Sequence, residues 1–183
     1  MRTKLLPLAL ALTATVAAAC AQASGLERSW QRLHTPPPGS VLVLNRALEI
    51  PPGEGEVYVQ DGRVLPYADV DPFRPHCALE LRGAPPVAVT VPPGRYRIVR
   101  VVHDEDPNLV RGPARGPLLA SLWLAGGPSQ WMYATELYLA GDGPNAPWRL
   151  RCGHWEDPSL DPRFLTLDEI RAALGPLATL ETP

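Results

Sequence analysis

Short stretches in which apolar and polar residues alternate, or in which β-branched and aromatic residues cluster, recur along most of the chain. Gly or Pro bounds most of these stretches, and this combination is typical of β-strands. Many short strands at such spacing indicate a β-sandwich or a barrel-like pair of antiparallel sheets. We therefore predict a mainly β protein with strands at residues 41–45, 56–60, 63–67, 77–81, 87–91, 95–102, 118–124, 131–139 and 147–152.

Turn residues agree with this pattern. Asp61 and Gly62 separate two predicted strands and form a two-residue hairpin signal, because both positions tolerate a positive φ. Pro-Pro-Gly occurs three times, at residues 37–39, 51–53 and 92–94, each time before a strand. A Pro-Gly pair suits the central positions of a type II turn, so we predict three chain reversals.

The C-terminal region has a helical pattern instead. Thr166 and Glu169 have the spacing of a capping box, and Gly175 followed by Pro176 is a stop signal. We predict one short C-terminal α-helix that packs on the sheet through three residues on one side, Leu167, Ile170 and Leu174.

The N-terminus has the pattern of a secretory signal peptide. Arg2 and Lys4 precede a largely apolar stretch at residues 5–19, which is shorter than the ~20 residues of a membrane-spanning helix. Ala21-Gln22-Ala23 fits the cleavage rule. We predict a signal peptide at residues 1–23, an extended Pro-rich segment at 24–40 and a single β-rich domain at 41–183.

Cys20 leaves a second processing route open. Ala17-Ala18-Ala19-Cys20 is a weak bacterial lipobox, which lacks the usual Leu three residues before the Cys. Simple cleavage gives a periplasmic protein, whereas lipidation at Cys20 gives an outer-membrane lipoprotein. Contact with a membrane is therefore expected only if Cys20 carries lipid.

Composition and charge exclude one class of partner. The 183 residues are 45% hydrophobic and 20% charged, which is enough apolar material for a packed core. Removal of residues 1–23 takes two basic residues from a net charge of −2, so the mature chain has about −4. Since a nucleic-acid partner requires clustered basic residues, we expect none.

Export bears on the state of the cysteines, because an oxidising compartment allows disulfides to form. Alternation places Cys77 with Leu79 on one face of its strand and Cys152 with Leu150 on one face of another, so both thiols point to the core. In an oxidising compartment we expect these two cysteines to form a disulfide. The alternative is a metal site that adds His76 and His154, although on an extended strand His76 faces away from Cys77.

Several segments together resemble a family of uncharacterised exported proteins of Gram-negative bacteria. The resemblance covers most of the mature chain and implies an envelope location and a β domain with paired cysteines, but no activity. The segments are residues 56–62, 75–81, 91–96 and 150–157, together with the helix at 165–175.

Candidate catalytic residues are few. His103 precedes three acids in His103-Asp104-Glu105-Asp106, a run that could bind a cation or supply a general base, although a solvated acidic loop at the end of a strand is commoner. The sequence contains no G-x-S-x-G elbow and no phosphate-binding glycine loop. We expect no cofactor, and an enzyme is the less favoured interpretation.

Aromatic residues suggest a binding face. Trp123, Trp131, Tyr133 and Tyr138 lie in two neighbouring predicted strands. Tyr138 and Glu136 have the parity opposite to Leu137 and Leu139, so this pair points outward. Glu136, Tyr138 and Trp131 are candidates for a ligand face, although ordinary core packing is the commoner role of aromatic residues in a sandwich.

Two functions of different classes remain. The first is a non-catalytic binding or assembly module of the bacterial cell envelope, stabilised by one disulfide, whose partner is an envelope protein or a small ligand. The second is a metal-dependent protein or hydrolase that uses the histidines near the cysteines or the acidic run at His103.

Overall fold

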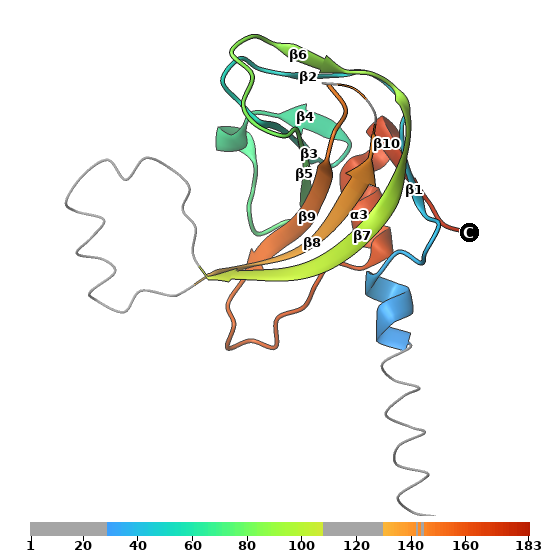
Figure 1. Ribbon diagram of the computed structural model, residues 1–183. Coiled ribbons are helices and arrows are strands. Elements are labelled where there is room, and N and C mark those ends of the chain that lie inside the picture. The colour runs from blue at the N-terminus through green and yellow to red at the C-terminus, as the bar shows by residue number, and fades with distance from the viewer. Residues whose placement is uncertain (1–28, 108–129, 142, 144) are drawn as a thin grey trace, which may run out of the picture.

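The computed structural model describes residues 29–107, 130–141, 143 and 145–183 (Figure 1). The predicted signal peptide, Cys20, Trp123 and the predicted strand at 118–124 lie outside these residues. Within the described residues, no helix is both long enough and apolar enough to cross a membrane.

Antiparallel strands make up 45% of the described chain. One curled sheet has the order β10-β1-β7-β8-β9-β5-β3-β4, and β2 pairs with β6 in a small second sheet. The prediction of a mainly β fold with barrel-like antiparallel sheets and one short C-terminal helix is confirmed. The strands are β1 (Val41–Leu44), β2 (Leu48–Ile50), β3 (Glu56–Gln60), β4 (Arg63–Leu65), β5 (His76–Glu80), β6 (Val89–Val91), β7 (Gly94–Pro107), β8 (Trp131–Ala140), β9 (Arg149–Glu156) and β10 (Ala178–Glu181).

The longest strand, β7, differs from the prediction. It continues to Pro107, so the acidic run after His103 lies within a strand that pairs with β8, and the expectation of a loop there was wrong. Val99 is an extra residue in this pair, a β-bulge between Ile98 and Arg100. A bulge reverses the alternation beyond it, which decides the direction of the acidic side chains.

Two of the three predicted Pro-Pro-Gly turns have the expected backbone. Gly39 and Gly53 have φ values of 90° and 76°, as a type II turn requires. Gly94 does not have a positive φ, because it is already the first residue of β7. β6 leads directly into β7, and the β2–β6 pair lies beyond the β1–β7 pair as a bent extension of it (Figure 1). The third predicted reversal is therefore a bend within a ribbon.

Alternation gives the main sheet two chemically different faces. The apolar face packs against helix α3 (Leu167–Leu174), which contacts β3, β5 and β10. These strands lie near opposite ends of the strand order, so the helix bridges the two ends of the curled sheet. The opposite face, here called the polar face, carries most of the charged groups of the central strands. Residues that build the core on the apolar face include Leu42, Leu44, Val57, Val59, Leu79, Leu137 and Leu150.

Helix α3 begins and ends as the sequence predicts. Glu169 N donates to Thr166 Oγ1 at 3.3 Å and Thr166 N donates to Glu169 Oε2 at 2.8 Å, which completes the capping box. The predicted Asp61-Gly62 turn joins β3 to β4 with positive φ at both residues. Gly62 N donates to Ala173 O at 2.9 Å, so this turn holds the end of the helix.

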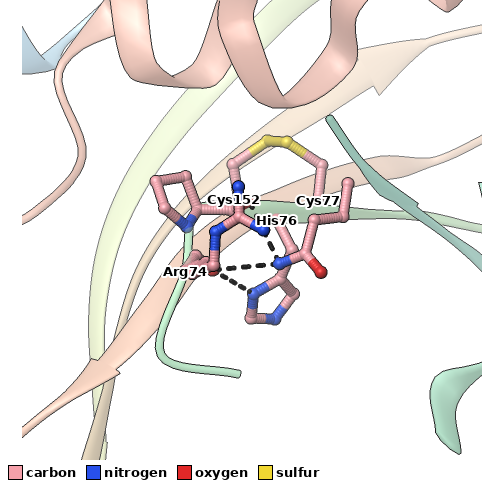
Figure 2. The surroundings of a disulfide bond; sticks show 6 residues. Arg74, His76, Cys77 and Cys152 are labelled. Carbon is pink, nitrogen blue, oxygen red and sulfur yellow. Dashed lines mark hydrogen bonds between the residues drawn. A yellow bond between two sulfur atoms is a disulfide. The ribbon is translucent and has the colours of Figure 1, made fainter. Parts of the chain in front are cut away.

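The predicted disulfide is present. Cys77 and Cys152 are register partners on β5 and β9, both are fully buried, and their sulfurs are bonded across 75 residues of sequence. The bond lies on the apolar face, toward the helix (Figure 2). Closing a loop of this length stabilises a fold by about 4 kcal/mol in the chain-entropy account.

The N-terminal part of the described chain is helical at residues 29–34, where an extended segment was predicted. Trp30 stacks on His34 with ring centroids 4.9 Å apart, and a ring nitrogen of His34, Nδ1, lies 3.1 Å from the carbonyl oxygen of Leu165. The prolines that suggested an extended chain begin only at residue 36, after this helical turn. The buried His34 ring and its contact with Leu165 therefore accompany this helical turn before the prolines begin.

Gly153 is a position where the packing of strands requires glycine. A Cβ there would lie 2.4 Å from the carbonyl oxygen of Tyr133 and 2.9 Å from Ala134 Cα, both backbone atoms of the neighbouring strand. We predict that Gly153→Ala lowers the free energy of unfolding by about 1–3 kcal/mol, as overpacking does, measured by guanidinium denaturation.

The matched control is Gly94→Ala. A Cβ on Gly94 makes only ordinary contacts with Tyr96, the nearest at 3.5 Å. This variant should remain within about 1 kcal/mol of the parent chain. Equal stability of the two variants would contradict the β8–β9 register described here.

Candidate functional site

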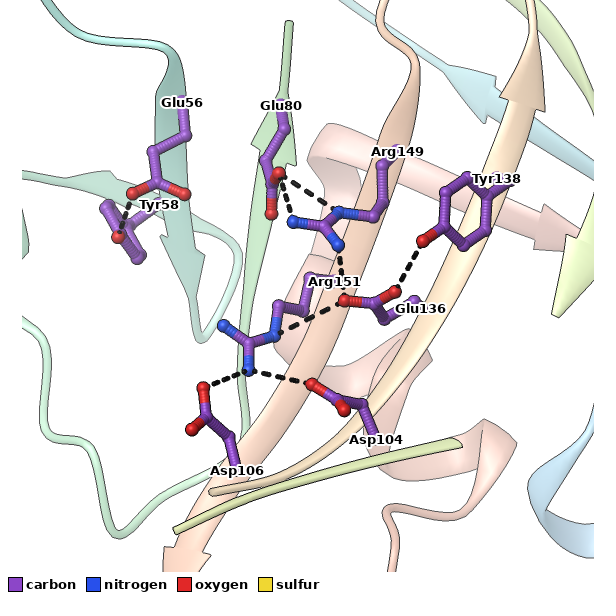
Figure 3. A network of polar contacts seen from close by, with 9 residues as sticks. All are labelled: Glu56, Tyr58, Glu80, Asp104, Asp106, Glu136, Tyr138, Arg149 and Arg151. Carbon is purple, nitrogen blue, oxygen red and sulfur yellow. Dashed lines mark hydrogen bonds and ion pairs between the residues drawn. The ribbon is translucent and has the colours of Figure 1, made fainter. Parts of the chain in front are cut away.

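The polar face of the sheet gathers charged side chains from five strands, β3, β5, β7, β8 and β9 (Figure 3). Alternation alone places the residues of β3, β5, β8 and β9 on this face. Asp104 and Asp106 reach it because the bulge at Val99 reverses the alternation of β7. The charged residues of this face include Glu56, Glu80, Asp104, Asp106, Glu136, Arg149 and Arg151. Arg100 stacks over the ring of Tyr138 at the margin of this face.

Arg149 joins two buried carboxylates. Its Nη2 and Nε donate to Glu80 Oε2 at 2.6 and 3.0 Å, and its Nη1 donates to Glu136 Oε1. Only 12% of the Glu80 side chain and 8% of the Glu136 side chain are exposed. Burial raises the pKa of Glu80 even though Arg149 acts in the opposite direction. Arg149, Glu80 and Glu136 thus form one hydrogen-bonded group, here called the Arg149 unit.

Arg151, two residues further along the same strand, is paired much more loosely. Its Nη2 lies 3.4 Å from Asp104 and 3.5 Å from Asp106, and its Nε lies 3.8 Å from Glu136. The Nε is buried and makes no hydrogen bond among the described residues. A largely buried guanidinium with unused donors is uncommon in a folded protein and often marks a functional site.

A pocket of about 580 Å³ opens beside Arg151. The chain at residues 53–56 and the loop at residues 67–72 form its walls, and the polar face forms its floor. Tyr58 and Tyr67 pack together with ring centroids 5.1 Å apart, and Phe73 supports the ring of Trp155 at 6.1 Å. The side chains that line the pocket from the sheet are Glu56, Tyr58, His76, Ala78, Asp106, Met132, Arg151 and Trp155.

His76 projects from β5 on the side opposite to the disulfide (Figure 2). Its Nδ1 lies 2.9 Å from the carbonyl oxygen of Arg74 and donates to it. Burial lowers the pKa of His76, so the ring is neutral near pH 7 and Nε2 carries a lone pair. The residue is only 6% exposed, and Nε2 has no hydrogen-bond partner among the described residues.

The predicted ligand face is placed only in part on this surface. Glu136 and Tyr138 share the polar face, and Tyr138 Oη donates to Glu136 Oε2 at 2.8 Å. Glu136 is only 6% exposed because arginines cover it. Trp131 is five positions before Glu136, so alternation along β8 places it on the other face. None of the three residues lines the pocket.

The histidines proposed as metal ligands do not converge with the cysteines. The sulfurs of Cys77 and Cys152 are bonded to each other, and His76 lies on the opposite face from both. His154 shares the face of Cys152 and pairs instead with Glu156, with Nε2 and Oε1 2.7 Å apart. In the part of the chain that the structure describes, no three His, Cys, Asp or Glu side chains are grouped to hold a metal ion.

Alternation separates His103 from Asp104 and Asp106, whereas Glu105 shares its face of β7. The two ring nitrogens of His103 lie 2.9 Å from Thr35 Oγ1 and 3.1 Å from Thr135 Oγ1. The ring packs against Trp30 and Phe164 on the apolar face, and burial and the charge of His34 lower the pKa of His103. Asp104 points to the polar face, so it does not orient the His103 ring, whose two nitrogens contact Thr35 and Thr135 instead.

The sequence analysis does not identify Arg151, Trp155, Tyr58 or the role of His76 in the pocket. A signal for them exists in the same alternation that identified the cysteines. Each residue has the parity opposite to an apolar neighbour on its strand, so polar side chains from three adjacent strands, β3, β5 and β9, share a face. The pocket wall could not be found this way, because its loops come from irregular segments.

Comparison of the chain with protein-family models, with curated proteins and with solved structures gave no match. The expected relation to exported proteins of Gram-negative bacteria is therefore carried by the sequence segments alone.

We expect the Arg149 unit to contribute to the stability of the fold. Arg149→Met leaves Glu80 and Glu136 buried without their cation, which should lower the free energy of unfolding by about 3–5 kcal/mol near pH 7. The pKa of Glu80 should rise further in this variant. Because a raised folded-state pKa favours the protonated form, the deficit should shrink as the pH falls from 7 toward 5. Denaturant unfolding at both pH values measures this.

Arg95→Met is the matched control. Arg95 pairs with Glu181 at 2.5 Å, but both side chains are largely exposed. An exposed pair contributes little, so this variant should lose only a small fraction of what Arg149→Met loses. A deficit for Arg149→Met that stays constant with pH would show that Glu80 does not become an unpaired buried carboxylate.

Proposed function

We propose that the chain is a non-catalytic binding module of the bacterial cell envelope, which holds a small polar ligand in the pocket on its polar face. The N-terminal pattern of residues 1–23 supports export, and the Cys77–Cys152 bond is compatible with an oxidising compartment. The pocket volume of about 580 Å³ is in the range that holds a small molecule.

The lining of the pocket carries this proposal, because it brings together a buried histidine with a free ring nitrogen, a loosely paired guanidinium and an aromatic ring. A buried guanidinium usually has all its donors satisfied, whereas the Nε of Arg151 has no hydrogen bond and its Nη2 contacts are 3.4 Å or longer. These groups line one pocket, which offers the free ring nitrogen of His76 and the aromatic ring of Trp155 to a ligand. Aromatic and apolar surface combined with convergent polar groups is typical of small-molecule sites.

A hydrolase is the alternative that one observation favours. His76, which is neutral, and Asp106 line the same pocket, so a general base and a carboxylate are both present there. The described lining residues include no serine, threonine, cysteine or lysine, so a covalent route would have to use a carboxylate or a tyrosine. Binding without catalysis needs none of these additional steps, and we therefore propose it.

Fluorine NMR of the fluorotryptophan-labelled mature protein tests the proposal. Trp155 lines the pocket, whereas Trp148 lies outside it, and Trp→Phe variants assign the signals. The low-molecular-weight fraction of a bacterial envelope extract is expected to shift the Trp155 signal and to leave the Trp148 signal unchanged. Ala78→Leu, which fills the floor of the pocket, should abolish the shift.

Thr90→Leu is the control, since it adds a similar side chain at an exposed position of β6, outside the pocket. This variant should respond as the parent protein does. A Trp155 signal that the extract leaves unchanged, or a shift that survives in Ala78→Leu, would contradict a ligand site in this pocket.

A further inference from the structure

We propose that the ligand of this pocket is a small organic cation, an alkyl ammonium whose N–H groups are accepted by His76 and by the carboxylates of the wall. This inference rests on the proposed function, because it names the class of ligand for the same site. Three independent features of the pocket carry it: its charge, its free acceptor and its aromatic surface.

Charge is the first feature. Three carboxylates, those of Glu54, Glu56 and Asp106, line the pocket, and Arg151 is the one guanidinium among the described lining residues. Arg151 is itself contacted by Asp104 and Asp106 and lies 3.8 Å from Glu136. Its positive charge is therefore offset from within the sheet, and the wall as a whole attracts a cation.

The free acceptor is the second feature. His76 is more than nine-tenths buried, and its Nδ1 is fixed as a donor by the carbonyl oxygen of Arg74. Its Nε2 is consequently an acceptor that has no donor among the described residues. An ammonium group supplies such a donor. An anionic ligand would leave this lone pair unpaired and would face the carboxylates of the wall.

The aromatic surface is the third feature. Tyr58, Tyr67 and Trp155 line the pocket, and ring faces attract cations as well as alkyl chains. Tyr58 Oη donates to Glu56, so its hydroxyl is already used and its ring remains as contact surface. A neutral polyol could also stack on these rings, but it would gain nothing from the negative charge of the wall. Charge therefore separates the two classes of ligand.

Three probes with the same carbon chain and different charge test the class of ligand. Diaminobutane, butanediol and succinate are titrated into the labelled mature protein while the Trp155 signal is followed. Diaminobutane should bind at least about tenfold more tightly than butanediol, which is the scale of one hydrogen bond to a charged group. Succinate should give no saturable shift.

Two variants locate the contacts. His76→Phe keeps a ring but removes the acceptor, and Asp106→Asn removes one charge while it keeps the shape of the side chain. Each should weaken the binding of diaminobutane by about tenfold. Asp168→Asn, on helix α3 and away from the pocket, should leave it unchanged. Should His76→Phe fail to fold, Asp106→Asn still decides the result.

The outcomes separate this inference from the proposed function. Equal or tighter binding of butanediol or succinate would overturn the cation and leave a ligand pocket in place. The same holds if the envelope extract shifts the Trp155 signal and diaminobutane does not. If neither the extract nor any probe shifts this signal, the cation and the proposed function are both overturned.

Discussion

The bond between Cys77 and Cys152 determines which side chains reach each face of the sheet. The two residues are register partners on β5 and β9, at the centre of the strand order and on the apolar face. A slip of one residue between these strands would turn polar side chains into the core. The covalent bond excludes this slip, so His76 and Arg151 project to the polar face as a consequence of a bond on the other side of the same strands.

The polar face also depends on a local irregularity. Without the bulge at Val99, alternation would direct Asp104 and Asp106 toward the core, and Arg151 would lose its two partners on β7. Arg149 is already fully used by Glu80 and Glu136. The two arginines thus differ in role although they are two residues apart. Arg149 neutralises buried acids, whereas Arg151 lines the pocket and is only loosely paired.

The sequence predicts the regular parts of this fold well, because alternation, turn residues and capping act over a few neighbouring residues. The helix with its capping box, the Asp61-Gly62 turn and the inward direction of both cysteines are local signals of this kind. The parity of Glu136 and Tyr138 was also correct.

The remaining features depend on contacts between distant segments. β2 and β10 are three and four residues long and are stabilised by pairing with β6 and β1, which their own sequences do not reveal. The bulge in β7 can be recognised only in the paired sheet. The pocket combines loops and strands that are far apart in sequence, so it could not be predicted as a site. Its individual polar side chains could have been found from parity.

Peptide mapping of the exported protein without reduction tests the central claim most directly, namely that β5 and β9 are held in this register by one covalent bond. Cleavage after Arg151 releases a peptide at residues 152–163 that begins with Cys152. The account predicts that this peptide is linked to the one containing Cys77. Free thiols at both positions, or a link from either cysteine to Cys20, would contradict it.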